Sequence, residues 1–305
     1  MKKCKVLVIS GGGIFGAIPA RFLSFVGKQT EDGAIKDLDD VDCIAGASIG
    51  GILAAAYAAG RDFVTIDQVF QKRAKDCFKK TIAGKVNPLA NHKYDNDSLD
   101  SVIKEMIGDI TLGQVSKIYP TLNVVVACLN LTDDEYYIFD HKRDAEVKLA
   151  DIGSYTSAAP SYFGARNFRG KCVVDSGLIE VFPVMTAVTT MHKRTGIPFS
   201  DMDVLAIGVG QDISPKAMTL DRFEGLSLLG IATDVIVPYA TLSNSMVVRL
   251  YGENIGLNSF KFWNPIHTNG ELDDWKQIPD LVKECDIYRD EFVKLWNNWL
   301  YSDED

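Results

Sequence analysis

The stretch VDCIAGASIGGILAAAYAAG, residues 41–60, decides the fold. A short apolar run meets a turn of small residues, and an alanine-rich segment of high helix propensity follows directly. This order predicts a strand, a sharp turn and a helix. Such a turn would expose the hydroxyl of Ser48 at the helix N-terminus, where free N–H groups favour developing negative charge. We expect Ser48 to be a nucleophile, and the alternative is a serine that only caps the helix.

The composition is that of an ordinary globular protein. With 305 residues, of which 47% are hydrophobic and 24% charged, the chain can bury a large core. A net charge of −9 argues against nucleic-acid binding and against a general attraction to anionic membranes, so any lipid contact would be local and apolar.

The six cysteines include no C-x-x-C pair, which predicts neither a metal nor a redox site and fits a reducing cytosolic compartment. Four of them lie in or beside predicted strands and are expected as small buried residues: Cys4, Cys43, Cys128 and Cys172. The apolar run Val6–Ile9 is too short for a signal peptide, and residues 226–250 contain charges and a proline that exclude a membrane span. We therefore expect a soluble, cytoplasmic protein that touches membranes peripherally.

Predicted strands and helices alternate along the chain. Strands are expected at Lys5–Ser10, Val41–Ala45, Thr121–Leu131, Lys171–Asp175 and Asp203–Val209, and helices at 14–26, 65–79 (capped by Thr65), 98–107 and 182–193. This alternation predicts an α/β fold with a mainly parallel central sheet. No internal repeat or linker divides the chain, so we expect a single domain over residues 1–305 with a helical C-terminal extension from about residue 265. Residues 226–239 are expected as a core helix, and the alternatives are a segment that lines an acyl pocket or one that touches a bilayer.

Three predicted strand ends carry groups suited to acyl transfer. Glycines 11–13, Ser48 and Asp175 each follow or end a strand, and the carboxyl ends of parallel strands meet at one edge of a sheet. Ser48 would attack, and Asp175 would take its proton or orient the group that does. The predicted oxyanion donors are the N–H groups of Gly11, Gly12, Gly13 and Ile49.

The same glycines also permit a nucleotide-binding interpretation. Gly11, Gly13 and Gly16 satisfy G-x-G-x-x-G. The acidic residue expected about 20 positions later, at the end of a second strand, is not clearly placed, and no G-K-[ST] follows. We therefore favour the hydrolase interpretation, which requires no cofactor.

Four blocks of the sequence resemble the patatin-like phospholipase family, in order and spacing, over about residues 5–185. They are GGGIFG at 11–16 (the oxyanion block), GASIG at 46–50 (the nucleophile elbow), TSAAPSYF at 156–163 (the Ser-Ala-Ala-Pro block) and DSG at 175–177 (the acid motif). The resemblance implies a three-layer patatin-like fold. It also implies a Ser–Asp dyad that hydrolyses lipid acyl esters, in the manner of a phospholipase A acting on membrane phospholipids, without a metal.

The resemblance has four departures, of which one is the segment EVFP at 180–183, which matches the family's Asn-rich segment before proline only loosely. Phe15 stands where the family usually has Arg or Lys, which leaves substrate preference open. Ser10 replaces a frequent Asp. Ser176 replaces the middle glycine of the acid motif, a change expected to affect only backbone freedom beside Asp175.

Other functions remain as alternatives. A Ser–Asp–His esterase would need a histidine after the acid, which only His192 and His267 satisfy, and both are expected at the surface. A catalytically weak lipid- or protein-binding module, and an effector activated by a ligand or by oligomerisation, would keep the same fold. By resemblance, some patatin-like proteins of bacterial antiviral signalling are regulated in this way. The head group, the acyl chain and homo-oligomerisation stay open.

Overall fold

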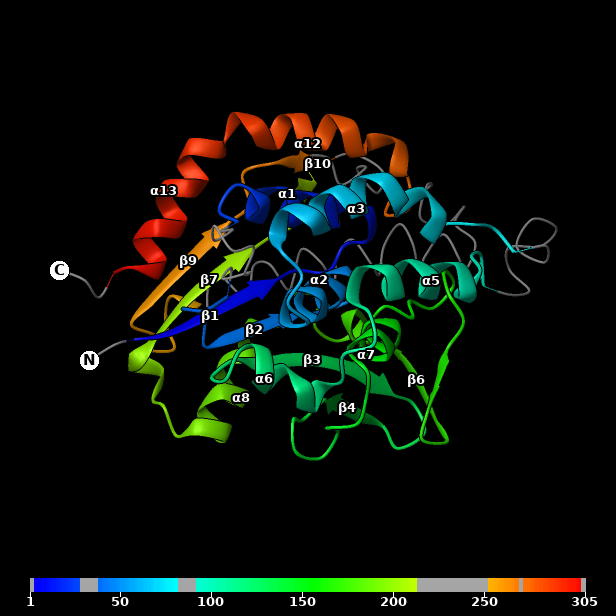
Figure 1. Ribbon diagram of the computed structural model, residues 1–305, viewed down its shortest axis with the longest axis horizontal. Coiled ribbons are helices and arrows are strands. Elements are labelled where there is room, and N and C mark those ends of the chain that lie inside the picture. The colour runs from blue at the N-terminus through cyan, green and yellow to red at the C-terminus, as the bar shows by residue number, and fades with distance from the viewer. Residues whose placement is uncertain (1–2, 28–37, 82–91, 213–251, 269–270, 303–305) are drawn as a thin grey trace, which may run out of the picture.

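The computed structural model describes residues 3–27, 38–81, 92–212, 252–268 and 271–302 (Figure 1). Within these ranges, eight strands form one sheet of order β5-β6-β3-β2-β1-β7-β9, with β4 paired to β3. They are β1 (Cys4–Ile9), β2 (Cys43–Gly46), β3 (Asn123–Asn130), β4 (Glu135–Ile138), β5 (Arg166–Phe168), β6 (Lys171–Asp175), β7 (Met202–Ile207) and β9 (Ser259–Trp263). The five strands from β3 to β9 in this order are parallel, which confirms the predicted α/β fold with a mainly parallel sheet.

Helices cover both faces of the sheet, and α8 lies on the side opposite α1 and α3 (Figure 1). The helices are α1 (Ala17–Ser24), α2 (Ile49–Ala58), α3 (Phe63–Cys77), α5 (Asn96–Ile107), α6 (Val115–Ile118), α7 (Leu149–Thr156), α8 (Val184–Thr195), α12 (Ile278–Ile287) and α13 (Arg289–Leu300). A separate pair of short strands, β8 (Gln211–Asp212) and β10 (His267–Thr268), is also parallel.

The residues of β1 show how the strand period of two builds the layers. Leu7 and Ile9 belong to a hydrophobic cluster with residues of α1, α2 and α3. Val6 and Val8 point to the other face and pack with residues of α8. All four side chains are fully buried, which is typical of a central strand covered on both faces.

The register of β3 sets the level of the site. On one side Val126 pairs with Gly46, the last residue of β2, and two residues further along Cys128 pairs with Asp175. Strand β6 runs antiparallel to β3, so the premise that three carboxyl ends share a parallel edge was wrong for Asp175. Because β6 runs antiparallel to β3, its carboxyl end at Asp175 lies at the same height along β3 as the turn that follows Gly46.

Several local predictions need correction. Helix α3 is capped by Asp62, whose carboxylate accepts the N–H of Thr65 at 2.7 Å, so Thr65 is not the cap. Cys172 is exposed rather than buried, and β5 was not predicted. The C-terminal extension is helical as expected but is divided between α12 and α13 around Tyr288. The predicted helix over 226–239 lies outside the described residues.

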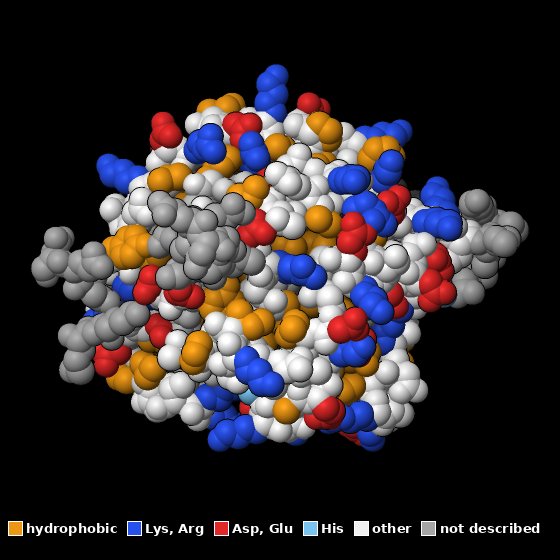
Figure 2. Space-filling model, in the orientation of Figure 1, with side chains coloured by type: hydrophobic (Ala, Val, Ile, Leu, Met, Phe, Trp, Pro, Cys, Tyr) orange, Lys and Arg blue, Asp and Glu red, His pale blue; other side chains and the backbone are white. Residues whose placement is uncertain are grey.

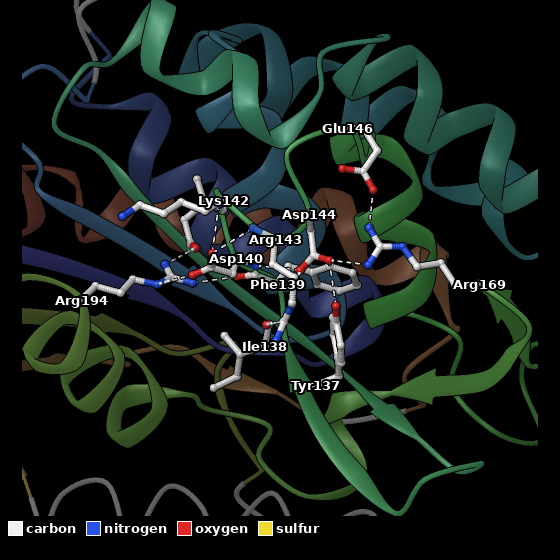
Figure 3. Close-up of polar contacts among 11 residues, drawn as sticks. Tyr137, Ile138, Phe139, Asp140, Lys142, Arg143, Asp144, Glu146, Arg169 and Arg194 are labelled. Carbon is white, nitrogen blue, oxygen red and sulfur yellow. Dashed lines mark hydrogen bonds and ion pairs between the residues drawn. The ribbon is translucent and has the colours of Figure 1, made fainter.

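The buried carboxylate of Asp144 links the β3–β4 hairpin to the β5–β6 pair, which ends at Asp175 (Figure 3). Asp144 is fully buried and accepts the Tyr137 hydroxyl at 2.7 Å and the Asp140 N–H at 3.0 Å. Two guanidinium groups complete its shell, Arg143 at 3.2 Å and Arg169 at 2.9 Å. Because Arg169 lies in the turn between β5 and β6, the network holds β6 in place relative to β4.

A second buried network links β1, β7 and the chain after α13. Lys5 Nζ lies 2.9 Å from Asp203 Oδ2, with both side chains 1% exposed, and 2.6 Å from the Ser302 hydroxyl. Asn258 and Ser259 also donate to Asp203, at 2.7 and 2.8 Å. Burial raises the pKa of Asp203, but the hydrogen bonds from Asn258, Lys5 and Ser259 outweigh it and hold that pKa below its usual value.

Replacing Lys5 with methionine should lower the free energy of unfolding by about 3–5 kcal/mol, because the Asp203 carboxylate would remain buried without its cation. Urea denaturation followed by circular dichroism measures the change. The double variant Lys5→Met/Asp203→Asn should recover part of the loss, since an amide at 203 buries no charge. A Lys5→Met protein as stable as wild type would contradict this account of the pair.

Candidate active site

Ser48 lies in a sharp turn between β2 and α2. Its backbone has φ 53° and ψ −126°, a strained conformation for a residue other than glycine. The turn is also tightly packed: a Cβ atom on Gly50 would lie 2.3 Å from the carbonyl oxygen of Ile9, and one on Gly46 would lie 2.1 Å from that of Gly50. These contacts explain the small residues of the turn. The side chain of Ser48 is half-buried, so it remains accessible.

Asp175 ends β6 and lies next to this turn. Its carboxylate accepts the N–H of Gly177 at 2.7 Å and is hydrogen-bonded by the side chain of Ser48. The residue is only 4% exposed. Burial raises the pKa of Asp175 to about 6, and the hydrogen bonds from Ser48 and Gly177 offset part of that rise. At neutral pH the carboxylate is therefore ionised and can accept a proton from a hydroxyl group.

The first glycine of the predicted oxyanion loop is already engaged. The N–H of Gly11 donates to the carbonyl oxygen of Val181 at 2.8 Å, so it is not available to an oxyanion in this conformation. A Cβ atom on Gly11 would lie 3.1 Å from the Cβ of Ser48. Gly11 therefore packs against Ser48 instead of supplying a hydrogen-bond donor to an oxyanion.

The next two glycines keep their N–H groups available. Within the described ranges, neither Gly12 nor Gly13 donates its N–H to a protein acceptor. Gly13 has φ 57°, and a Cβ atom there would lie 2.2 Å from the carbonyl oxygen of Leu272. The same carbonyl accepts the N–H of Ile14 at 2.9 Å. Leu272, far along the chain, therefore fixes the conformation of the glycine loop.

A further donor lies at the start of α2. Ile49 is the first residue of this helix, so its N–H has no acceptor within the helix. The N–H of Ser48 is used differently, since it donates to Thr156 Oγ1 at 3.2 Å. Among the described residues, Gly12, Gly13 and Ile49 therefore keep backbone N–H groups that donate to no protein acceptor.

Comparison with known proteins identifies the family. The family model described as patatin-like phospholipase matches residues 7–188, more than half of the chain. The chain belongs to the patatin-like phospholipase family. Membership supports lipid acyl hydrolase activity in general terms.

Similar relatives of this patatin-like phospholipase include bacterial and plant proteins. A cGAMP-activated phospholipase of Escherichia coli (strain TW11681) is 26% identical over 299 residues, covering 89% of this chain and 83% of the relative. Patatin-like protein 2 of Oryza sativa subsp. indica is 30% identical over 225 residues, covering 63% of this chain and 54% of the relative. The chain thus spans about half the length of the rice protein.

Similar solved structures include two bacterial proteins. VipD from Legionella pneumophila has a TM-score of 0.41 at 13% identity, covering 93% of this chain and 67% of that one. ExoU of Pseudomonas aeruginosa, in complex with SpcU, has a TM-score of 0.38 at 14% identity, covering 82% of this chain and 53% of that one.

Three departures of this patatin-like phospholipase from the family pattern have structural explanations. Phe15 is 6% exposed and belongs to the main hydrophobic cluster, so it fills core volume. Ser10 is 5% exposed, and its hydroxyl donates to the carbonyl oxygen of Gly11 at 3.1 Å. Ser176, expected to affect only backbone freedom, is fully buried and lies 3.1 Å from the Thr156 hydroxyl, an interaction that no sequence pattern indicated.

Neither candidate histidine is bonded to the pair. His192 Nδ1 lies 2.8 Å from the carbonyl oxygen of Ile197 near the end of α8, and His267 is exposed in β10. In the described part of the chain, the groups bonded to the Asp175 carboxylate are the Ser48 side chain and the Gly177 N–H.

The surface shown in Figure 2 carries charged side chains of both signs. On the face shown in Figure 2, the Lys and Arg side chains lie among Asp and Glu side chains instead of gathering into one basic area. Among the residues with defined positions, no cluster of His, Cys, Asp and Glu could hold a metal ion. None of their helices is long and apolar enough to cross a membrane.

Proposed function

We propose that this chain is a serine lipid acyl hydrolase of the phospholipase A type, which releases fatty acids from membrane glycerolipids. Ser48 is the nucleophile and Asp175 is the general base. The observation that carries the proposal is that the Ser48 side chain, on a half-buried residue with a strained backbone, interacts with the buried Asp175 carboxyl and lowers its pKa. Family membership supports the lipid ester as substrate class.

The proposed reaction has two halves. Asp175 takes the hydroxyl proton while Ser48 Oγ attacks the ester carbonyl carbon, and the N–H groups of Gly12, Gly13 and Ile49 stabilise the oxyanion. The intermediate collapses to an acyl-serine, and Asp175 returns the proton to the departing lysolipid. Water then attacks the acyl-serine carbonyl while Asp175 takes a proton from it, the bond between the acyl carbon and Ser48 Oγ breaks, and Asp175 returns the proton to Ser48 Oγ as the fatty acid leaves. The cycle uses no cofactor.

A fluorophosphonate probe and a lipid panel test this proposal. The probe should label the protein on the peptide that contains Ser48, as read by mass spectrometry after proteolysis. Wild-type protein should release free fatty acids from vesicles of diacyl phospholipids, while a sphingolipid with only an amide-linked acyl chain serves as the negative control. Absence of labelling and of fatty acid release would favour a lipid- or protein-binding module instead.

A ligand-activated enzyme is the second candidate function. The relative from Escherichia coli named a cGAMP-activated phospholipase matches 89% of this chain. The lipid assay is therefore run with and without cGAMP. Fatty acid release that requires the nucleotide would identify a regulated effector, whereas equal release in both assays would identify a constitutive enzyme.

We also propose that the enzyme works in the cytoplasm and touches the bilayer beside its acid residue. All six cysteines are free thiols, which fits a reducing compartment. Leu178 and Ile179 follow the Asp175 turn directly and are 46% and 58% exposed. Two adjacent exposed aliphatic side chains so close to the proposed base would enter the lipid interface as the ester approaches Ser48.

Replacing Ile179 with aspartate should lower hydrolysis of zwitterionic phosphatidylcholine vesicles by about tenfold, because a charge there must be desolvated at the interface. Hydrolysis of soluble p-nitrophenyl butyrate should stay within about twofold of wild type, since the substitution leaves the dyad intact. Ile287→Asp, on α12 at a position that is 76% exposed against 58% for Ile179, is the control for an added surface charge. Equal losses on both substrates would contradict a bilayer contact.

A further inference from the structure

Two buried hydroxyl groups lie directly behind the Ser48–Asp175 pair. Thr156, the last residue of α7, and Ser176, the first residue after β6, are both fully buried. Their hydroxyl oxygens are 3.1 Å apart. Neither hydroxyl faces solvent, and neither is a reacting group in the proposed mechanism. We therefore explain their pairing by the neighbouring groups to which they are hydrogen-bonded.

The Thr156 hydroxyl is bonded to the backbone of the nucleophile. Its oxygen accepts the N–H of Ser48 at 3.2 Å and is also hydrogen-bonded to the Ser176 hydroxyl at 3.1 Å, a bond in which either hydroxyl can donate. Ser48 has a positive φ, and this bond connects its strained turn to the end of α7. The methyl group of Thr156 packs against α2, because a Cβ atom on Gly51 would lie 2.7 Å from it.

The segment that follows Thr156 is hydrogen-bonded to the backbone of Asp175. The carbonyl oxygen of Ala158 accepts the N–H of Asp175 at 3.1 Å. Three consecutive residues, 156–158, thus contact the backbone of the nucleophile at one end and that of the acid at the other. The Thr156–Ser176 bond closes this bridge from the side of the acid.

We propose that Thr156 is a positioning residue, with Ser176 as its partner, that sets the separation of the Ser48 hydroxyl from the Asp175 carboxylate. The inference rests on the proposed function, because it assigns a role within the Ser48–Asp175 pair. It also gives Ser176 a role: the serine that replaces the family's glycine supplies the second hydroxyl of the bridge. A turn held in this way has its nucleophile preorganised before substrate binds.

The test compares Thr156→Val, which keeps the shape and removes the hydroxyl, with Thr156→Ser, which keeps the hydroxyl and removes the methyl group. Hydrolysis of p-nitrophenyl butyrate and the rate of fluorophosphonate labelling are measured for both, with melting temperatures recorded alongside. Thr156→Val should lower kcat and the labelling rate by about 100-fold, because misplacing a reacting group by a small distance typically costs that much in rate. KM should stay within about threefold of wild type. Thr156→Ser should stay within about fivefold of wild type on both measures.

A pH profile separates positioning from a general loss of structure. A weaker Ser48–Asp175 hydrogen bond would favour the carboxylate less, so the ascending limb of the labelling rate should move to higher pH in Thr156→Val and stay in place in Thr156→Ser. Ser176→Ala should lower the rate less than Thr156→Val, and the double variant should be no slower than Thr156→Val alone.

Three results would overturn the proposal: wild-type kcat in Thr156→Val, equal losses in the Val and Ser variants, or additive losses in the double variant. If Thr156→Val does not fold, Ser176→Ala alone decides, and a wild-type labelling rate with an unshifted pH limb would reject the bridge. Wild-type protein that neither reacts with the probe nor hydrolyses the ester would instead reject the proposed function, so the two failures are distinguishable.

Discussion

Replacing Ser48 with alanine should reduce fatty acid release by about 10⁴-fold or more and abolish labelling by the fluorophosphonate probe. In the proposed mechanism the hydroxyl oxygen of Ser48 forms the acyl-enzyme, and no other described side chain bonded to Asp175 can replace it. Mass spectrometry of released fatty acids, over the same lipid panel as wild type, measures the loss.

The folded state of Ser48→Ala should be nearly unchanged. The alanine keeps the Cβ atom and the backbone N–H that bonds Thr156, so the variant should melt cooperatively near the wild-type temperature. Ser154→Ala is a suitable control, because its hydroxyl donates to the Asp100 carboxylate at 2.7 Å and is not bonded to the pair. Hydrolysis retained in Ser48→Ala would remove the serine mechanism.

Replacing Asp175 with asparagine should lower kcat by about 10²–10⁴-fold, which is the typical contribution of a general base. The amide can still accept the Gly177 N–H but cannot take the proton of Ser48. Larger losses in His192→Ala or His267→Ala than in Asp175→Asn would favour a Ser–Asp–His triad instead.

The pH dependence follows from the same carboxyl group. Because burial raises its pKa to about 6, the base is ionised only above that pH, so kcat/KM of wild type should rise through pH 6 and level off by about pH 7. Asp175→Asn should lose this limb. Its stability should not suffer: a raised pKa in the folded state means that ionising Asp175 costs stability as pH rises from about 4 to 6, and an amide removes that cost.

The part of the site that local sequence determines was predictable. Small residues around Ser48 are required by contacts within the turn itself and with the neighbouring strand, so they appear as one short pattern. The bounds of β6 were also predicted from its apolar run. Its direction was not, because the β5–β6 hairpin turns at Arg169 and Gly170, both with positive φ, and arginine is an unusual residue for the first of these positions.

The rest of the site depends on contacts between distant segments. Gly11 lies in the expected loop, but its N–H is taken by Val181, a residue 170 positions away whose placement no pattern near Gly11 reveals. The Thr156–Ser176 pair is similar, since either hydroxyl alone is typical of a helix end or a turn. A sequence pattern indicates which groups are present, whereas the availability of each N–H depends on tertiary contacts.

The contact between Leu272 and the glycine loop has a consequence for the evolution and engineering of this chain. The stretch that matches the family model, residues 7–188, contains Ser48 and Asp175, yet the Leu272 carbonyl that packs against Gly13 and accepts the Ile14 N–H comes from outside it. A chimaera that joins this stretch to the C-terminal part of another protein would contain Ser48 and Asp175. It would lack the Leu272 carbonyl that fixes the conformation of the glycine loop. Swapping halves between relatives should therefore succeed only where the donor half supplies an equivalent carbonyl.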